Sequence, residues 1–249
     1  MTYTKLLEVK EATTADYTRV VEDFLNDRGV KFVLGFSGSA DDSSPLLRHV
    51  VEHITDAARA DEFDALIADA KREYVAGIVR DVLAPLRGYR IAVLTGGTAW
   101  GVPAVATEVA KDMGFATIGV FPLAASLKQS TMLPDGLLDL AICVHPFVGE
   151  SQWGDEAAVY TKLLNALVII GGGAGTMVEV AHLLKQNEKN LPIKHLVPIL
   201  GTGGTADVLP FFPGKPKVMA QCVSSQAITS GEEACRHLKK VALIDDVYD

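Results

Sequence analysis

A short apolar run that ends in a cluster of glycines constrains the fold of this chain more than any other feature. Residues 166–184 read ALVIIGGGAGTMVEVAHLL. The run Leu167–Ile170 has the length of a strand, and the residues after the glycines repeat with helical spacing: Met177, Val180, Ala181 and Leu184. The pattern predicts a buried strand, a tight turn and a helix that begins within the turn.

The start of this predicted helix suits an anion. The N–H groups of a first helical turn have no partner inside the helix, and the positive end of the helix dipole adds to their attraction for negative charge. Gly172, Gly173 and Gly175 let a ligand approach the backbone because they carry no Cβ, and Thr176 can add a hydroxyl. We predict a nucleotide-phosphate pocket here, with Glu179 as its candidate catalytic carboxylate.

Both assignments have a structural alternative. Strand-to-helix turns in α/β proteins need glycine for geometry alone, but four glycines within residues 171–175 exceed that need. An acid such as Glu179 is favoured near a helix N-terminus on electrostatic grounds, whether or not it has a function. The glutamate taken alone therefore does not indicate catalysis.

Glycine-rich turns also follow other predicted strands. The strand predicted at residues 31–36 runs into a Ser-Gly-Ser turn, and the strand predicted at residues 89–94 runs into TGGTAWG. A third turn, GTGGT at residues 201–205, follows a strand predicted at residues 196–200. The carboxyl ends of parallel strands form the ligand crevice of an open sheet, so we expect these turns at one rim. The additional predicted nucleotide-binding residues are Ser37, Gly38, Ser39, Gly96, Gly97, Thr98 and Gly101.

Strand and helix patterns alternate along the chain. Further strands are predicted at residues 116–121 and 137–144, a polar loop at 123–132, and helices at 45–55, 61–86 and 150–165. This alternation predicts an α/β fold, with a doubly wound parallel sheet that has helices on both faces. We expect a single domain over residues 1–249, with a core of about residues 30–205. The C-terminal appendage, residues 206–249, contains a possible strand at 218–223 and a helix with Ser230 and Glu233 as its capping box.

Composition excludes several classes of partner. The chain has 249 residues, a net charge of −8, a pI of about 5.3 and no run of Lys or Arg, so nucleic acid is not an expected partner. Its three cysteines are far apart and predict neither a disulfide framework nor a zinc site. The apolar runs have strand length, and no signal peptide pattern begins at Met1. We therefore expect an unprocessed cytoplasmic protein with no membrane segment.

Other catalytic patterns are missing or ambiguous. The sequence has no Walker G-x-x-x-x-G-K-[ST] and no G-x-S-x-G elbow, and it does not cleanly match the dinucleotide fingerprint G-x-G-x-x-G. The acidic stretch at residues 41–64 lacks the tight carboxylate spacing of a metal site, so we interpret it as a solvated face and expect no metal or cofactor. His145 is either an acid or base or a structural residue, and Trp100 either stacks on a base or covers an apolar edge.

Three segments resemble those of one known family. Gly172–Glu179 is similar to the motif PGGxGTxxE, TGGTAWGVPAVATEVAKDMGFATIGVFP is similar to a second glycine segment, and FSGS is similar to an opening turn. All three occur in the LOG family, cytokinin-activating nucleoside 5′-monophosphate phosphoribohydrolases that were long mislabelled lysine decarboxylases. The resemblance runs in order from about Lys31 to Leu200. It implies a modified Rossmann sheet that binds a nucleotide or nucleotide derivative, and a homo-oligomer that is usually a dimer.

The chain also departs from the LOG pattern. Gly171 replaces the family's proline, and residues 39–88 are longer than the corresponding segment. The family carries an arginine on the helix before the glycine motif, which acts with the glutamate in catalysis. Here the predicted helix at 150–165 contains no arginine, and Lys162 is its only basic residue. The TGGTxxGV turn further resembles the nucleotide-sensing regions of melastatin-type TRP channels and their bacterial relatives, which are thought to bind ADP-ribose-like ligands.

Two functional hypotheses follow from these features. In the first, the protein hydrolyses the N-glycosidic bond of a nucleoside 5′-monophosphate, and Glu179 stabilises oxocarbenium-like charge or activates water. In the second, the protein is a non-catalytic sensor or carrier of a nucleotide or ADP-ribose-like ligand, and Glu179 binds ribose hydroxyls. The missing arginine motivates the second hypothesis.

Overall fold

The fold is a parallel α/β sheet with helices on both faces, as the alternating sequence pattern predicts. The computed structural model describes residues 6–9, 14–39, 57–189 and 192–242. Its seven strands form one parallel sheet in the order β1-β5-β4-β3-β2-β6-β7. The strands are β1 (Leu6–Val9), β2 (Phe32–Gly38), β3 (Ile91–Thr95), β4 (Ala116–Pro122), β5 (Leu140–Val144), β6 (Ala166–Ile170) and β7 (His195–Ile199).

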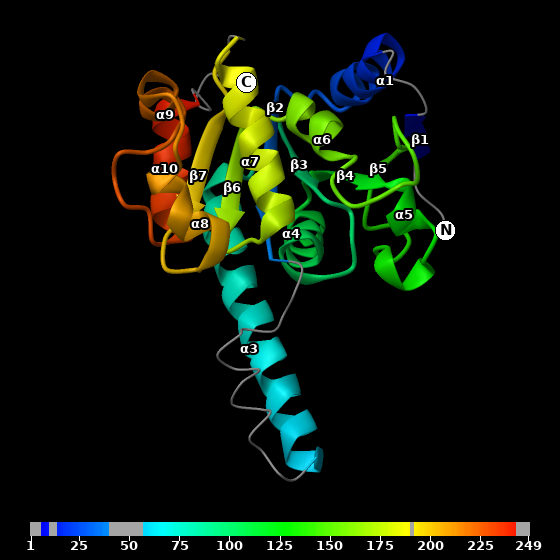
Figure 1. Cartoon of the computed structure of the whole chain (residues 1–249), viewed down its shortest axis with the longest axis vertical. Coiled ribbons are helices and arrows are strands. Elements are labelled where there is room, and N and C mark those ends of the chain that lie inside the picture. The colour runs from blue at the N-terminus through cyan, green and yellow to red at the C-terminus, as the bar shows by residue number, and fades with distance from the viewer. Residues whose placement is uncertain (1–5, 10–13, 40–56, 190–191, 243–249) are drawn as a thin grey trace.

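The helices cover the two faces of this sheet (Figure 1). They are α1 (Thr14–Asp27), α3 (Ala57–Leu83), α4 (Gly101–Asp112), α5 (Leu123–Ser126), α6 (Ala157–Leu163), α7 (Ala174–Asn187), α8 (Gly204–Val208), α9 (Pro216–Cys222) and α10 (Gly231–Val241). Short 3-10 helices occupy Ala84–Leu86, Gln129–Thr131 and Leu209–Phe211. No helix among the described residues is long and apolar enough to cross a membrane.

Alternate strand residues enter two separate cores. Phe32, Leu34 and Phe36 of β2 pack with α3, α4 and α10, whereas Val33 packs on the other face with α1, α6, α7 and α9. This division follows from the strand period of two, which sends successive side chains to opposite faces. Because both faces are covered, the central strands are apolar throughout, as parallel sheets require. Helix α10 belongs to the first core through Ala234, Cys235 and Leu238.

The order of the strands defines a switch point between β2 and β6. From β2 the chain moves outward through β3, β4 and β5, and it then returns to place β6 and β7 on the other side of β2. The helices after β2 and β6 therefore leave toward opposite faces, and the carboxyl ends of these two strands lie at the place where open α/β sheets bind ligands.

Helix α3 has two halves with different surroundings. Its C-terminal half is buried against the sheet and neighbouring helices through Ile78, Val79 and Val82. The N-terminal half projects from the body of the molecule in Figure 1, and Leu66 there is exposed. The helix predicted at residues 61–86 corresponds to α3 and the 3-10 turn that follows it, and it begins four residues earlier than predicted. The helix predicted at residues 45–55 lies outside the described residues.

Three local predictions differ from the structure, and one strand was not predicted. The helix predicted at residues 150–165 begins only at residue 157, because Gly154 has a φ of +106° and the Asp155 carboxylate accepts a hydrogen bond from the Gln152 amide, which together make a turn. The strand predicted at residues 218–223 is wrong: this segment is α9, which begins at Pro216, a residue whose fixed φ suits the first helical position. The polar loop predicted at residues 123–132 contains α5, and the edge strand β1 carries no recognisable pattern.

Candidate functional site

The glycine-rich turns meet at the carboxyl edge of the sheet. Strands β3, β2, β6 and β7 are neighbours, and each ends in one of the turns identified from the sequence. The turns are Thr95–Gly101 after β3, Ser37–Ser39 after β2, Gly171–Gly175 after β6 and Gly201–Thr205 after β7. The switch point lies in the middle of this row.

Ser39 joins three of these segments through its backbone. Its N–H donates to the Ile170 carbonyl at 3.3 Å, and its carbonyl accepts from the Val102 N–H at 2.9 Å. The preceding residue, Gly38, lies so close to β6 that a Cβ there would overlap the Ile170 carbonyl oxygen. The turn after β2 is therefore held against both the end of β6 and the start of α4.

The turn after β7 supports the turn after β6 from behind. The Thr202 hydroxyl accepts from the Gly171 N–H at 2.8 Å, and the Thr205 N–H donates to the Gly172 carbonyl at 2.8 Å. The Thr205 hydroxyl also donates to the Gly173 carbonyl at 3.0 Å. Carbonyl groups of the glycine turn are thus engaged by the neighbouring turn.

The start of α7 is open toward solvent. Gly173 is its N-cap and provides no side-chain cap, and Gly173, Ala174 and Gly175 are exposed. A Cβ added at Gly173 or Gly175 would meet no atom within 4 Å. The first-turn amides have no acceptor inside the helix, and the positive end of the helix dipole lies here. This is the geometry expected of an anion-binding helix start.

Glu179 contacts the turn after β2. The Ser37 hydroxyl donates to the Glu179 carboxylate and also lies 3.2 Å from the Thr176 hydroxyl oxygen. Thr176 in turn donates to the Gly38 carbonyl at 3.3 Å. Ser37 and Thr176 are buried, so their hydroxyls hold Glu179 and the turn in place rather than pointing into solvent.

Burial changes the ionisation of Glu179. It raises the pKa of the Glu179 carboxyl to about 8; the Ser37 hydrogen bond opposes the shift and the charge of Glu156 adds to it. Within the described part of the chain, no cation acts on the pKa of Glu179. Burial also raises the pKa of Tyr160, whose hydroxyl donates to the Phe36 carbonyl at 3.0 Å. Glu179 is therefore mainly neutral at pH 7.

The turn after β3 is largely used for packing. The Gly97 N–H donates to the Thr95 hydroxyl at 3.2 Å, and a Cβ at Gly97 would lie only 2.9 Å from the Phe121 ring. Thr98 and Gly101 are buried, and Gly96 is half-buried. The structure brings these four predicted site residues to the carboxyl edge of the sheet, but it places Gly97 against β4.

Two residues considered from the sequence have contrasting positions. His145 follows β5 and lies beside Glu8, with Nε2 and Oε2 4.0 Å apart, at the β1 side of the sheet and away from the switch point. Trp100 is exposed at the start of α4, and its ring centroid lies 6.5 Å from that of Trp153. Sequence reasoning missed Trp153 because it assigned this residue to a helix.

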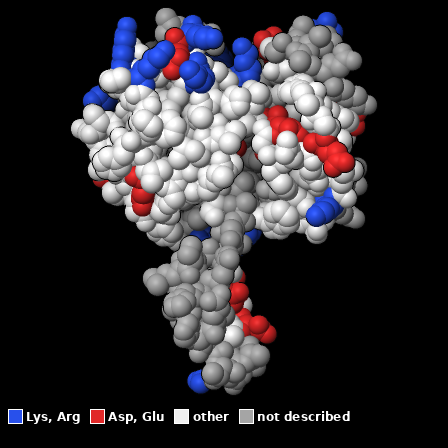
Figure 2. Space-filling view, in the orientation of Figure 1, with Lys and Arg blue, Asp and Glu red and all other residues white. Residues whose placement is uncertain are grey.

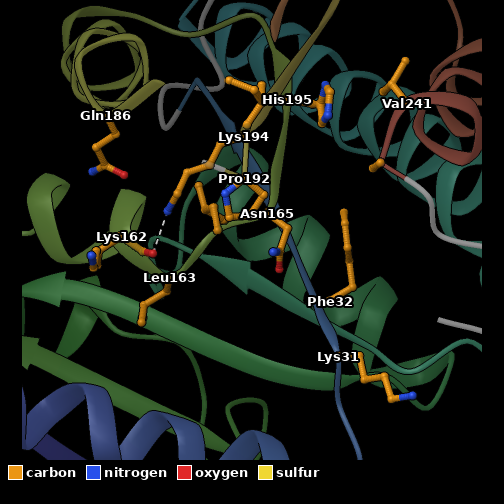
Figure 3. Close-up of a pocket in the computed structure, with 13 residues that line it drawn as sticks. Lys31, Phe32, Lys162, Leu163, Asn165, Gln186, Pro192, Lys194, His195 and Val241 are labelled. Carbon is orange, nitrogen blue, oxygen red and sulfur yellow. Dashed lines mark hydrogen bonds between the residues drawn. The ribbon is translucent and has the colours of Figure 1, made fainter. Parts of the chain in front are cut away.

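A hollow lies at the opposite edge of the sheet, where the strands begin. This amino-edge hollow has a volume of about 730 Å³ and is lined in part by Lys31, Lys162, Lys194 and His195 (Figure 3). Lys194 Nζ donates to the carbonyls of Thr161 at 2.7 Å and Lys162 at 2.6 Å, at the end of α6. Figure 2 shows Lys and Arg gathered over this end of the molecule. Such cations compensate the negative ends of helix dipoles.

The amino-edge hollow also locates Lys162. This residue is the only basic one in residues 150–165, and it lies at the edge of the sheet opposite Glu179. It therefore cannot replace the arginine that the LOG family pairs with its glutamate. No group of three or more metal-ligating side chains occurs among the residues that the structure describes.

Solved structures share this fold at low sequence identity. The protein TM1055 is 18% identical with a TM-score of 0.55, over 85% of this chain and 100% of its own. The molybdenum cofactor carrier protein MCP from Chlamydomonas reinhardtii is 21% identical with a TM-score of 0.51, over 86% of this chain and 99% of its own. The molybdenum cofactor binding protein from the phototrophic bacterium Rippkaea orientalis is 21% identical with a TM-score of 0.51, over 85% of this chain and 97% of its own.

The family of this chain is assigned from its sequence and not from its likeness to these structures. No curated protein matches the chain. The model of the SLOG cluster4 family matches residues 68–203, more than half of the chain, and SLOG denotes the SMF/DprA-LOG superfamily. This match confirms the predicted relationship to LOG proteins, and it includes the turns after β3 and β6 and the first residues of the turn after β7. The chain therefore belongs to the SLOG cluster4 family.

Proposed function

We propose that this protein binds a nucleotide or nucleotide derivative at the carboxyl edge of its sheet and holds it without cleaving it. The observation that carries this proposal is the exposed, uncapped start of α7 at the switch point between β2 and β6. A phosphate there accepts hydrogen bonds from first-turn amides and gains from the helix dipole. Gly172, Gly173, Gly175 and the Ser37–Ser39 turn form the wall around it.

The ionisation of Glu179 favours binding over catalysis. A carboxylate stabilises an oxocarbenium-like transition state only when it is charged. With a pKa of about 8, Glu179 is mainly protonated at pH 7, and an arriving phosphate disfavours its ionised form further. A neutral carboxyl can instead donate a hydrogen bond to a ribose hydroxyl or to the phosphate itself.

The fold neighbours agree with a carrier role. Two of them are a molybdenum cofactor carrier protein and a molybdenum cofactor binding protein, and both cover most of this chain. At 21% identity they support a small-molecule ligand in this fold without identifying which one this chain takes.

Hydrolysis of a nucleoside 5′-monophosphate is the second candidate function. Its support is the position of Glu179 beside the glycine turn, together with a pKa close to neutrality, which suits a general acid. In this reaction, Glu179 would protonate the leaving base while water attacks the ribose.

Calorimetry and a base-release assay distinguish the two functions. We expect AMP or ADP-ribose to bind the full chain, and chromatography to detect no free adenine or other cleavage product after hours of incubation. Adenine release that disappears in Glu179→Gln would establish the hydrolase instead. If calorimetry detects no binding of any nucleotide, both functions are rejected.

Two further expectations from the sequence accompany the proposal. We propose a homo-oligomer in the cytoplasm, supported by the LOG relationship and by three cysteines that are buried and free in the structure. Light scattering coupled to size-exclusion chromatography tests the oligomer, and a mass equal to the 26.6 kDa of one chain would contradict it.

A further inference from the structure

The geometry points to a clamp formed by Trp100 and Trp153 that stacks on a fused two-ring base, so that the preferred ligand is a purine nucleotide. This inference rests on the proposed function, because the clamp binds the base of the same ligand whose phosphate lies at α7. It adds the residues that hold the base, which neither the glycine turns nor the family relationship identifies.

The two tryptophans come from opposite sides of the site. Trp100 is the N-cap of α4, which begins directly after the turn that follows β3. This helix start is held to the turn after β2 by the hydrogen bond from Val102 to Ser39 at 2.9 Å. Trp100 is therefore tied through the backbone to the same edge that carries the start of α7.

Trp153 reaches the site from the turn before α6. The next residue, Gly154, donates its N–H to the Glu156 carboxylate at 2.9 Å. Glu156 is close enough to Glu179 for its charge to contribute to the raised pKa of that carboxyl. The turn that carries Trp153 thus lies near Glu179, while Trp100 lies at the end of the turn after β3.

The separation of the rings is close to the one that a flat group stacked between them needs. The centroids are 6.5 Å apart and the rings are tilted by 44°. A flat ring stacked between two others needs a centroid separation of about 7 Å, since carbon atoms in contact lie about 3.5 Å apart. Stacking therefore requires the two rings to turn parallel and to move slightly apart.

Exposure distinguishes this pair from core aromatic residues. Trp100 is 41% exposed and Trp153 is 56% exposed, although large aromatic side chains are usually well buried. Two adjacent exposed indoles beside a polar site are typical of a surface that recognises a flat apolar group. A purine overlaps both indoles more fully than a single-ring pyrimidine does, and bare ribose phosphate has no ring to stack.

Intrinsic fluorescence reports directly on the clamp. The chain contains only two tryptophans, so emission excited at the tryptophan band comes entirely from this pair. We expect AMP to quench the emission of the full chain and to bind about ten-fold more tightly than UMP. Ribose 5-phosphate should bind more weakly still by calorimetry and leave the emission unchanged.

Substitutions separate the clamp from the phosphate site. Trp153→Ala should weaken AMP binding about ten-fold while ribose 5-phosphate binding stays as in wild type, and Trp153→Phe should restore most of the AMP affinity. The matched control is Phe211→Ala, which removes an exposed aromatic ring elsewhere and should change neither affinity. Melting temperatures of all variants confirm that each remains folded.

The possible failures are distinguishable. If AMP, UMP and ribose 5-phosphate bind equally and Trp153→Ala changes nothing, the clamp is rejected and the proposed phosphate site stands. If AMP binds without altering the emission of either tryptophan, the clamp is also rejected. If none of these ligands binds, the clamp and the proposed function are rejected together.

Discussion

At the scale of single residues, Glu179 shows how a sequence position acquires its chemistry from its neighbours. The sequence places it within the first turns of a helix, where an acid is common. Its raised pKa comes instead from burial and from the charge of Glu156, against the opposing effect of the Ser37 hydrogen bond, and these residues are far apart in the chain. This dependence on distant residues makes its ionisation, and therefore its role, invisible in the sequence.

The ionisation of Glu179 predicts a stability effect. Because its pKa rises from 4.5 in the unfolded chain to about 8 in the folded protein, its contribution is complete below pH 4.5 and is lost as the pH rises through 8. We expect the free energy of unfolding of Glu179→Gln, relative to wild type, to increase between pH 5 and pH 8 in urea titrations. The exposed Glu22→Gln is the control and should show no such trend; a flat difference for Glu179→Gln would contradict the raised pKa.

Gly173 tests the ligand site without disturbing the fold. A Cβ at this position meets nothing within 4 Å, and its φ of −108° is open to any residue. We expect Gly173→Ala to keep the melting temperature within a few degrees and to weaken nucleotide binding about ten-fold, since the Cβ hinders approach to the α7 amides. Gly77→Ala, in helix α3 and also without close neighbours, is the matched control. Equal affinity for wild type and Gly173→Ala would count against the site.

Prediction at the level of single residues succeeded for local backbone structure. The glycine turn after β6 and the helix that begins in it were predicted because tight turns and helical spacing impose their own residue types. The position of Trp153 beside Trp100 was not predicted. The hydrogen bonds of the Thr176 hydroxyl with Ser37 and Gly38 could not be predicted either. Both depend on which strands become neighbours, which no local pattern contains.

At the scale of elements, the site depends on turns that brace one another. The turn after β6 is supported by the turn after β7, through Thr202 and Thr205. Gly204 is at the tightest point, because its φ is +55° and a Cβ there would overlap the Gly172 carbonyl. The third glycine turn therefore shapes the site from behind.

This bracing predicts different effects for two neighbouring glycines. We expect Gly204→Ala to lower the melting temperature and to weaken nucleotide binding, because the turn after β6 must shift to remove the overlap. Gly201 has a φ of +85°, but a Cβ added there would meet no atom within 4 Å. Gly201→Ala should therefore lower the free energy of unfolding by only about 1 kcal/mol, through backbone strain, and leave nucleotide affinity unchanged. Identical behaviour of the two variants in thermal and binding assays would refute the bracing.

Element prediction failed where turns compete with helical patterns. The segment before α6 has helical composition, yet Gly154 and Asp155 form a turn, and α6 begins at residue 157. Residues 218–223 have the composition of a strand, yet a helix begins at Pro216 and runs to Cys222. Strands β2, β3, β4 and β6 were found within a few residues, because their apolar runs are buried on both faces.

At the scale of the whole molecule, Asp139 joins elements from both faces and the sheet. Its carboxylate accepts from Lys111 Nζ of α4 at 2.8 Å, from Arg28 after α1 at 3.2 Å and from the Thr117 amide of β4 at 3.0 Å. Burial tends to raise the pKa of Asp139, but these three partners outweigh it and lower the pKa below its usual value. The network lies away from the ligand edge.

Asp139→Asn should therefore lower stability without affecting the site. We expect a loss of about 1–3 kcal/mol in the free energy of unfolding at pH 7, since hydrogen bonds to a charged group are removed. Because the pKa of Asp139 is lower in the folded protein than in the unfolded chain, its stabilisation is present above the pKa of the unfolded chain and is lost as the pH falls through the pKa of the folded protein. The difference in the free energy of unfolding between Asp139→Asn and wild type should therefore shrink in acid. Urea titrations measure this; a constant difference down to pH 2, or altered nucleotide affinity, would contradict the assignment.

The overall fold was predictable because the pattern that determines it, alternating strands and helices, extends along most of the sequence. Alternating strand and helix patterns with buried strands leave few arrangements other than a doubly wound parallel sheet. The strand order was not predicted, and it is this order that puts β2 beside β6 and creates the switch point. Because ligands of open α/β sheets bind at the carboxyl ends of the strands beside the switch point, this order favours the carboxyl edge over the amino-edge hollow as the ligand site.

The location of the bound phosphate shows which edge of the sheet binds the nucleotide. A crystal of the protein soaked with adenosine 5′-phosphorothioate would show the ligand sulfur by its anomalous scattering. We expect a sulfur peak within hydrogen-bonding distance of the amides of residues 174–176 at the start of α7. A peak in the amino-edge hollow, beside Lys31 and Lys194, would contradict it.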